Sequence, residues 1–310
     1  MAVFSWYRFG VERTFDPQHK FVSSPVVSPS ILAGIRCLLA LYALVTICTV
    51  LGFDVASGDG KSFLSYFTQL SYIGLVAYYW AAAVQTFFFA RYGRYPLRRW
   101  PRPLQGLHVL LQSTITTFPF IVTVVYWALL ASADETFDTV LSSWENISIH
   151  ALNSPFALFE ILLTNAPPAP WLTLPFHILI LGGYIGVAYI THATQGFYTY
   201  SFLDPTKQHG LVAAYIIGIG VGDVVVFALA RGVVVLRQRL AIRSGRLAKD
   251  DGEVIGSGGD AEAIDEWQEI ERPVAGGKME RGGGGEGEGE GEPSRVIDSG
   301  VGAEAEAETV

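Results

Sequence analysis

Residues 31–53 read ILAGIRCLLALYALVTICTVLGF, an apolar run interrupted by one arginine, two cysteines and two threonines. A helix that spans a membrane needs about 20 mostly apolar residues. The Ser-Pro-Ser at 28–30, just before the run, is typical of a helix start. The stretch therefore predicts a membrane protein whose first span begins near residue 31.

Further apolar segments follow the first one, at 63–90, 107–131, 144–163, 171–190 and 210–236. Only 16% of the residues are charged, against roughly a quarter in soluble domains. Pro119 predicts a kink in the third segment. The fourth segment is the weakest because it contains Glu145, His150, Asn153 and Glu160, so a five-span alternative with this segment along the surface stays open. We predict an all-α, polytopic membrane helix bundle with about six transmembrane helices.

The basic residues of the connecting segments predict the orientation of these spans. Residues 91–102 carry five arginines and no acidic residue, and both the N-terminal arm and the residues after the last span are also basic. With six spans, all three basic segments fall on one side, whereas Lys61 and Lys207 are the only lysines or arginines of the opposite connections. Basic connections stay in the cytosol. We therefore expect both termini to be cytosolic, in the endoplasmic reticulum or the plasma membrane.

The C-terminal part of the chain has a different composition. Residues 250–310 hold 18 acidic and 4 basic residues and include the repeat GEGEGEGE. Alternating glycine and glutamate cannot bury enough apolar surface to fold. We predict a cytosolic N-terminal arm over 1–30, a six-helix transmembrane domain over 31–240 and a disordered acidic cytosolic tail over 241–310. The sequence identifies no partner for the tail, and we expect no nucleic-acid partner.

Two polar residues occupy matching depths in the second and fourth segments. Thr68 in SYFTQLSY and His150 in WENISIHALN lie about five residues past the outer ends of parallel helices, roughly 5–8 Å deep. Polar residues inside spans are costly and usually functional. A threonine hydroxyl becomes a nucleophile when a histidine removes its proton. The pair therefore indicates acyl transfer, with Thr68 as nucleophile and His150 as general base.

Three more polar residues form a candidate substrate-binding or supporting set. Asn153 shares a helix face with His150, and we expect it to orient His150 or to help hold an oxyanion. Glu160 follows seven residues after Asn153, and His192 ends the fifth span on the same side, where we expect it to line the pocket. Simpler interpretations stay open, because a threonine in a span often bonds its own helix and a histidine often bridges helices.

Other polar residues in the spans leave further alternatives. Arg36 and Asp223, in the first and last spans, could pair with each other or line a transport path. A dihaem electron carrier is another alternative, because four histidines form two layers, His108 with His177 and His150 with His192. Such histidines need no cofactor, and we expect neither a cofactor nor a metal site.

Three blocks of the sequence together resemble a known family. FTQLSY around Thr68, HALNSPFALFEILLTNAP from His150 and THATQGFYTYSFLDP from Thr191 resemble the androgen-induced and androgen-dependent TFPI-regulating protein family in order and spacing. The resemblance extends over about residues 30–205. The same blocks are also similar to rolling stone-like proteins.

The resemblance implies a function. It implies a six-span intramembrane threonine hydrolase that cleaves fatty acid esters of hydroxy fatty acids, with catalytic residues that match Thr68 and His150. Some members carry two histidines and a Tyr-Pro in the third block, where this chain has Thr191-His192 and Tyr200-Ser201. The expected function is an intramembrane hydrolase of lipid esters. The alternative is a non-catalytic multi-pass scaffold or transporter, as the similarity to rolling stone-like proteins allows.

The predicted topology has a direct test. Because the arginine-rich segments share one side, a C-terminal tag should resist protease added to sealed, right-side-out vesicles. Detergent should then make the tag cleavable. Digestion of the tag in intact vesicles would contradict the cytosolic placement of the termini.

Overall fold

The computed structural model describes residues 5–131 and 136–245, and every regular element within these residues is helical. The longer helices are α1 (Pro29–Ser57), α2 (Phe67–Tyr92), α3 (Arg102–Ile115), α4 (Phe118–Val125), α6 (Val140–His150), α7 (Asn153–Leu163), α8 (Leu174–Gln195) and α10 (Leu211–Arg243). Short helical turns join them at η1 (Lys20–Val22), η2 (Gly60–Ser65), η3 (Pro96–Arg99), η4 (a π turn, Tyr126–Leu130), η5 (Trp171–Thr173), η6 (Ser201–Leu203) and α9 (Pro205–Gln208). The all-α prediction is confirmed, and most of the predicted tail lies outside the described residues.

Local sequence signals fix the ends of the first long helix. The side chain of Ser28 accepts a hydrogen bond from the backbone N–H of Ile31, and Pro29 follows as the first helical residue. The helix ends at Gly58, whose φ of 90° lies in the left-handed region that favours glycine. The predicted start near residue 31 is therefore correct to within two residues.

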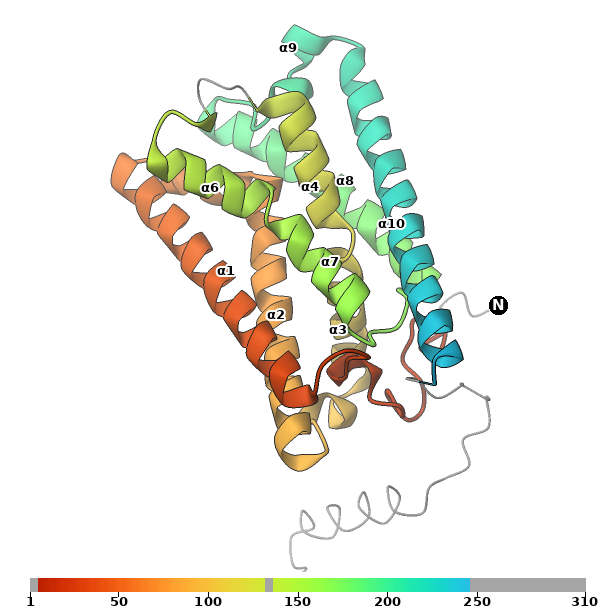
Figure 1. The fold of residues 1–310 in the computed structure, drawn as a ribbon. Coiled ribbons are helices and arrows are strands. Elements are labelled where there is room, and N and C mark those ends of the chain that lie inside the picture. Colours follow the sequence, from red (N-terminus) through yellow and green to blue (C-terminus); the bar gives the residue numbers. More distant parts are fainter. Residues whose placement is uncertain (1–4, 132–135, 246–310) are drawn as a thin grey trace, which may run out of the picture. The chain divides into compact units, whose positions relative to one another are not determined.

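Five helical stretches of the described chain are long and apolar enough to cross a membrane: Pro29–Ser57, Phe67–Tyr92, Arg102–Leu130, Trp171–Gln195 and Leu211–Arg243. They correspond to the predicted spans one, two, three, five and six. The protein is therefore an integral membrane protein by the length and composition of its helices. Figure 1 shows α1 and α2 side by side at one edge of the bundle and α10 at the opposite edge, with α4 and α7 between them.

The fourth predicted span is not one helix but two. α6 and α7 have 11 residues each and are separated at Ala151 and Leu152. A proline lacks the N–H that would bond the carbonyl four residues earlier, and its ring clashes with that carbonyl. Pro155 stands four residues after Ala151, which explains the break. The same effect separates α3 from α4, since α3 ends at Ile115, four residues before Pro119.

The connections between the helices gather at two ends of the bundle, which we call basal and apical. The basal end comprises residues 5–28, 93–101 and 164–173, and the apical end comprises residues 58–66 and 196–210. Within the basal end Tyr95 donates a hydrogen bond to Asp16, and the side chain of Asn165 donates one to Ser23. These bonds bring the N-terminal segment to the connections after α2 and α7.

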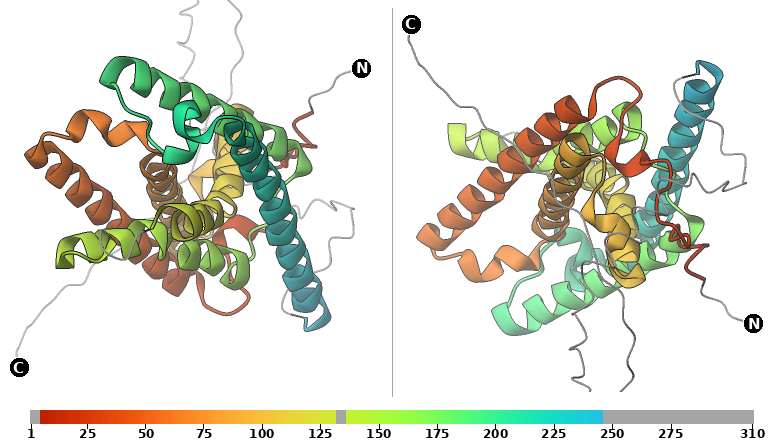
Figure 2. Two further views of the ribbon diagram at one scale, coloured as in Figure 1. Left: turned by 90° about the horizontal axis from the view of Figure 1, so that it is seen from above. Right: turned by 90° about the horizontal axis from the view of Figure 1, so that it is seen from below.

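The described helices supply five candidate membrane spans, and α6 and α7 lie where the sequence predicted the fourth of six. At the apical end the rings of Tyr66 and Tyr200 meet with their centroids 5.9 Å apart. Near the end of α10, Arg237 donates a hydrogen bond to the carbonyl of Ala166, so this part of α10 lies at the basal end. Figure 2 shows the bundle from above and from below, with α6 and α7 as separate helices.

A buried ion pair connects α1 and α7. Arg36 donates two hydrogen bonds to Glu160, from Nε at 2.9 Å and from Nη2 at 2.7 Å, and both side chains are fully buried. Arg36 also donates to Thr86, and Tyr78 donates to Glu160. A charge without a partner in this environment would be very costly. The bidentate pair therefore ties α1 and α2 to α7.

The structure corrects the suggested pairing of Arg36 with Asp223. Arg36 is fully engaged with Glu160, and Asp223 lies 3.5 Å from Nδ1 of His177 instead. The physical reason is that depth in the membrane does not specify which neighbouring helix a side chain faces. Each ionisable residue has its partner on a different helix from the one we considered.

Breaking the ion pair should destabilise the protein. Arg36→Met or Glu160→Gln leaves one buried charge uncompensated, which typically costs about 3–5 kcal/mol. The double variant should cost less than the sum of the single variants, because no unpaired charge remains. Thermal unfolding of the detergent-purified variants measures both effects, with the exposed Arg91→Met as control. Single variants as stable as that control would contradict the assigned role of the pair.

Candidate functional site

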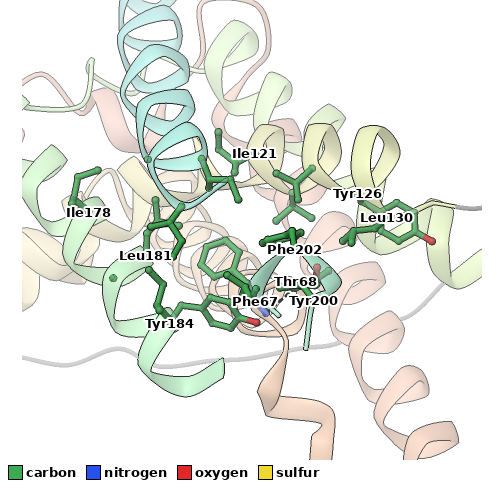
Figure 3. A pocket seen from close by; sticks show the side chains of 18 residues that line it. Phe67, Thr68, Ile121, Tyr126, Leu130, Ile178, Leu181, Tyr184, Tyr200 and Phe202 are labelled. Atoms are coloured by element: carbon green, nitrogen blue, oxygen red, sulfur yellow. Dashed lines mark hydrogen bonds between the residues drawn. The ribbon is translucent and has the colours of Figure 1, made fainter. Parts of the chain in front are cut away.

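An apolar cavity lies near the apical end of the bundle. Its volume is about 180 Å³, and it is lined by residues from α2, α4, η4, η6, α8 and α10. Most of the lining is aliphatic or aromatic, and the exceptions are Thr68 and the hydroxyls of Tyr126, Tyr184 and Tyr200. Figure 3 shows Thr68 beside Phe67 and Tyr200, with Ile178 and Leu130 on opposite sides. The cavity therefore combines a large apolar surface with a few hydroxyl groups.

Thr68 belongs to the first turn of α2 and is buried, with 7% of its surface exposed. The first N–H groups of a helix have no acceptor within the helix. The N–H of Phe67 donates to the Tyr200 hydroxyl at 3.1 Å, and Tyr200 lines the same cavity as Thr68. Burial raises the pKa of the Tyr200 phenol, which keeps its proton at neutral pH. Tyr200 is therefore available as a hydrogen-bond donor beside Thr68.

A second set of hydroxyls supports this corner of the cavity. Tyr184 donates to the backbone carbonyl of Ser65 at 3.0 Å and lies 3.1 Å from Thr199. Thr191 donates to the Ser65 hydroxyl at 2.9 Å. These bonds link α8 and the connection after it to the residues that precede α2. The position of Thr68 is thus fixed by contacts from three parts of the chain.

His150 lies next to the cavity without lining it. It is the last residue of α6 and is buried, and its ring stacks on Tyr126 with the ring centroids 3.5 Å apart. Tyr126 lines the cavity, and its hydroxyl donates to Asn146 at 2.6 Å. The structure thus brings both predicted catalytic residues to the same region, where Tyr126 connects His150 to the cavity that holds Thr68.

Asn153 holds the backbone at the break between α6 and α7. Its Oδ1 accepts hydrogen bonds from the N–H of Ser154 at 2.7 Å and from Thr123 at 3.0 Å. The same Thr123 hydroxyl lies 2.7 Å from the carbonyl of His150. Asn153 therefore supports the backbone that carries His150, through a residue of α4 that the sequence did not single out.

The other two predicted site residues lie elsewhere. His192 does not line the cavity; its ring stacks on Tyr198, with the centroids 3.8 Å apart. Glu160 is part of the buried ion pair with Arg36 and does not line the cavity either. Their depth in the spans was inferred from the sequence, but their direction around the helix axis was not. In the structure each already has a partner outside the cavity.

Three buried residues that the sequence did not connect, Ser113, His177 and Asp223, lie next to one another. Nε2 of His177 lies 2.8 Å from the hydroxyl of Ser113, and Nδ1 of His177 lies 3.5 Å from Asp223. Serine, histidine and aspartate in this order resemble a hydrolase triad. However, Thr173 donates to the carbonyl of Pro170, so its oxygen is free to accept the proton of Ser113 at 2.9 Å.

This direction of hydrogen bonding gives Ser113, His177 and Asp223 a structural role. His177 then donates to Ser113 instead of accepting its proton, which is the reverse of what a nucleophilic serine needs. All three side chains are fully buried, and they come from α3, α8 and α10. Ser113, His177 and Asp223 therefore tie these helices together. Ser113, His177 and Asp223 do not line the cavity, whereas Thr68 and the tyrosines near it do.

The residues proposed as haem or metal ligands have other neighbours in the structure. His108 stacks on Tyr78, with the ring centroids 5.7 Å apart, and His177 is bonded to Ser113. Among residues 5–131 and 136–245, no group of three histidine, cysteine, aspartate or glutamate side chains could hold a metal ion. Both cysteines are free and exposed.

A comparison of the sequence with known protein families identifies its family. The family model described as FAR-17a/AIG1-like protein matches residues 35–233, which is most of the helical domain. The chain belongs to the FAR-17a/AIG1-like family. This family is the one that the three sequence blocks suggested, so the resemblance is confirmed. No curated protein and no solved structure matches the chain.

Proposed function

We propose that this member of the FAR-17a/AIG1-like family is an intramembrane hydrolase of lipid esters, with Thr68 as the nucleophile and His150 as the general base. The substrate class is an ester whose acyl chain fits an apolar cavity within the bundle. By family resemblance, fatty acid esters of hydroxy fatty acids are the first substrates to test.

One observation carries the proposal: the Thr68 hydroxyl is not used by its own helix. Other buried threonines of the bundle donate to the carbonyl four residues earlier, as Thr86 does to Ala82 and Thr164 to Glu160. Thr68 has no preceding α-helical turn to bond, because α2 begins at Phe67. Its hydroxyl faces a tyrosine and an apolar cavity instead. The usual structural role of a membrane threonine therefore does not account for it.

The proposed reaction has two steps. Thr68 Oγ1 attacks the ester carbonyl carbon while His150 accepts the Thr68 proton; the C–O bond to the alcohol then breaks, and His150 protonates the departing alcohol. Water next attacks the acyl-threonine ester and gives its proton to His150. The fatty acid leaves, and Thr68 regains its proton. For the base to reach Thr68, the ring of Tyr126 must shift from its stack on His150.

Tyr200 and the first turn of α2 suit the negative charge that develops in both steps. The Tyr200 hydroxyl can donate a hydrogen bond to the oxyanion while its oxygen keeps accepting from Phe67. The N-terminus of a helix carries a partial positive charge, which adds to the same effect. We therefore assign oxyanion stabilisation to Tyr200, which lines the cavity, rather than to Asn153, which does not.

Loss of either proposed catalytic residue should abolish hydrolysis. Thr68→Ala or His150→Ala should lower kcat/KM by about 10²- to 10⁴-fold, because a positioned base and its nucleophile act as a unit. The double variant should lose little more than either single one. The assay is hydrolysis of a panel of lipid esters by purified protein in nanodiscs.

Matched variants make this assay decisive. Thr68→Ser keeps a hydroxyl and should retain activity, while Thr194→Ala removes an exposed threonine of α8 and should have no effect. His192→Ala should matter far less than His150→Ala, because His192 stacks outside the cavity. Undiminished cleavage by Thr68→Ala would exclude this nucleophile. A wild-type protein inert toward every ester would favour the scaffold or transporter alternative.

Tyr200→Phe tests the oxyanion assignment separately. The ring and its packing remain, so the fold and KM should change little, but kcat should fall by about 10²- to 10³-fold. Tyr198→Phe is the control, because Tyr198 packs on His192 away from the cavity. Equal kcat values for the two variants would show that the Tyr200 hydroxyl does not act in the transition state.

A further inference from the structure

Two glycines on different helices line the cavity that contains Thr68. They are Gly182 of α8 and Gly220 of α10. A Cβ atom added to either glycine would meet no atom within 4 Å. Glycine is therefore not needed at these positions to let the helices approach each other. Its effect is to leave open space between α8 and α10.

The same two helices are the most exposed of the bundle. In the most apolar stretches of α8 and α10, 22% and 17% of the residues are buried, against 39% to 50% in the other three long spans. Gly182 itself is exposed and Gly220 is partly exposed, although both line the cavity. The cavity therefore opens sideways between α8 and α10, toward the lipid that surrounds the bundle.

The size of the cavity requires such an opening for any long chain. At about 180 Å³ it is only slightly larger than the roughly 150 Å³ apolar cavities that hold a benzene molecule. It can accept the first carbons of an acyl chain beside Thr68 but not a whole fatty acyl group. The remainder has to continue along the gap between α8 and α10. The aliphatic residues at this gap, Ile178, Leu181 and Ile219, are suitable neighbours for it.

We propose that Gly182 and Gly220 determine which acyl chains the site accepts, by leaving a passage for a long chain from Thr68 to the lipid between α8 and α10. This inference rests on the proposed hydrolase function. It adds that the preferred esters carry a long, unbranched acyl chain on the carbonyl side of the scissile bond. Closing the passage should leave short-chain esters as substrates.

The test introduces a leucine at each glycine. Gly182→Leu, Gly220→Leu and the double variant are compared with Gly186→Leu and Gly218→Leu, which lie on the same helices, have open space at Cβ and do not line the cavity. The ratio of kcat/KM for a palmitate ester to that for a butyrate ester should fall by about tenfold or more in the first group. The control variants should keep the wild-type ratio.

A second readout separates this inference from the hydrolase function. A palmitate ester with a diazirine near the end of its chain is crosslinked to the inactive Thr68→Ala protein, and the modified peptides are identified by mass spectrometry. We expect crosslinks on α8 and α10 near Ile178 and Ile219, lost when Gly220→Leu is added and kept with Gly218→Leu.

Each outcome has a separate meaning. Hydrolysis with an unchanged chain-length ratio in Gly182→Leu and Gly220→Leu would overturn the passage and leave the hydrolase intact. Crosslinks that depend on Gly220, in a wild-type protein without esterase activity, would support the passage as an acyl-binding site and overturn the hydrolase. Neither activity nor crosslinks to α8 and α10 would overturn both.

Discussion

Polar groups within a membrane must find their partners inside the protein, because the surrounding lipid offers none. This constraint accounts for the strongest contacts of the bundle. Arg36 and Glu160 satisfy each other across α1 and α7, and His177 of α8 is hydrogen-bonded to Ser113 of α3 and lies 3.5 Å from Asp223 of α10. Each set is fully buried and holds together helices that lie far apart in the sequence. The apical cavity can therefore exist without the helices around it collapsing, because other residues fix their positions.

The same constraint explains the contacts at the two proline breaks, between α3 and α4 and between α6 and α7. A break leaves backbone carbonyls without their helical partners. The hydroxyl of Ser154, just after the second break, donates to the carbonyl of Pro119 at 3.2 Å, and Thr123 lies 2.7 Å from the carbonyl of His150. The broken helices α4 and α7 thus satisfy each other. As a result, His150 ends a helix beside Tyr126 instead of continuing along the outside of the bundle.

The sequence predicted the features that depend on hydropathy and on local stereochemistry. Apolar length predicted five of the spans, and Pro119 predicted the kink in the third one, but the fourth predicted span is two short helices. Contacts between helices were harder to predict from the sequence, since Arg36 could equally have faced Asp223. The depths of His192 and Glu160 in their spans did not show in which direction their side chains point. Tyr200 was quoted in the family block but not assigned a role. It lies in a connection between spans, where neither hydropathy nor helical periodicity indicates which side chains turn back toward a cavity.

The position of Thr68 suits the hydrolysis of a membrane lipid that we propose. The acyl chain needs an apolar environment, whereas the second step of an acyl-enzyme mechanism needs water. On one side of Thr68 is the apolar cavity, and on the other its neighbours Tyr66 and Gln69 line a polar groove together with Asp59 and Glu145. A nucleophile deeper in α2 would lack water, and one in the connection before α2 would lack the chain-binding surface. In the proposed mechanism, the first turn of α2 combines both surfaces with the partial positive charge of a helix N-terminus.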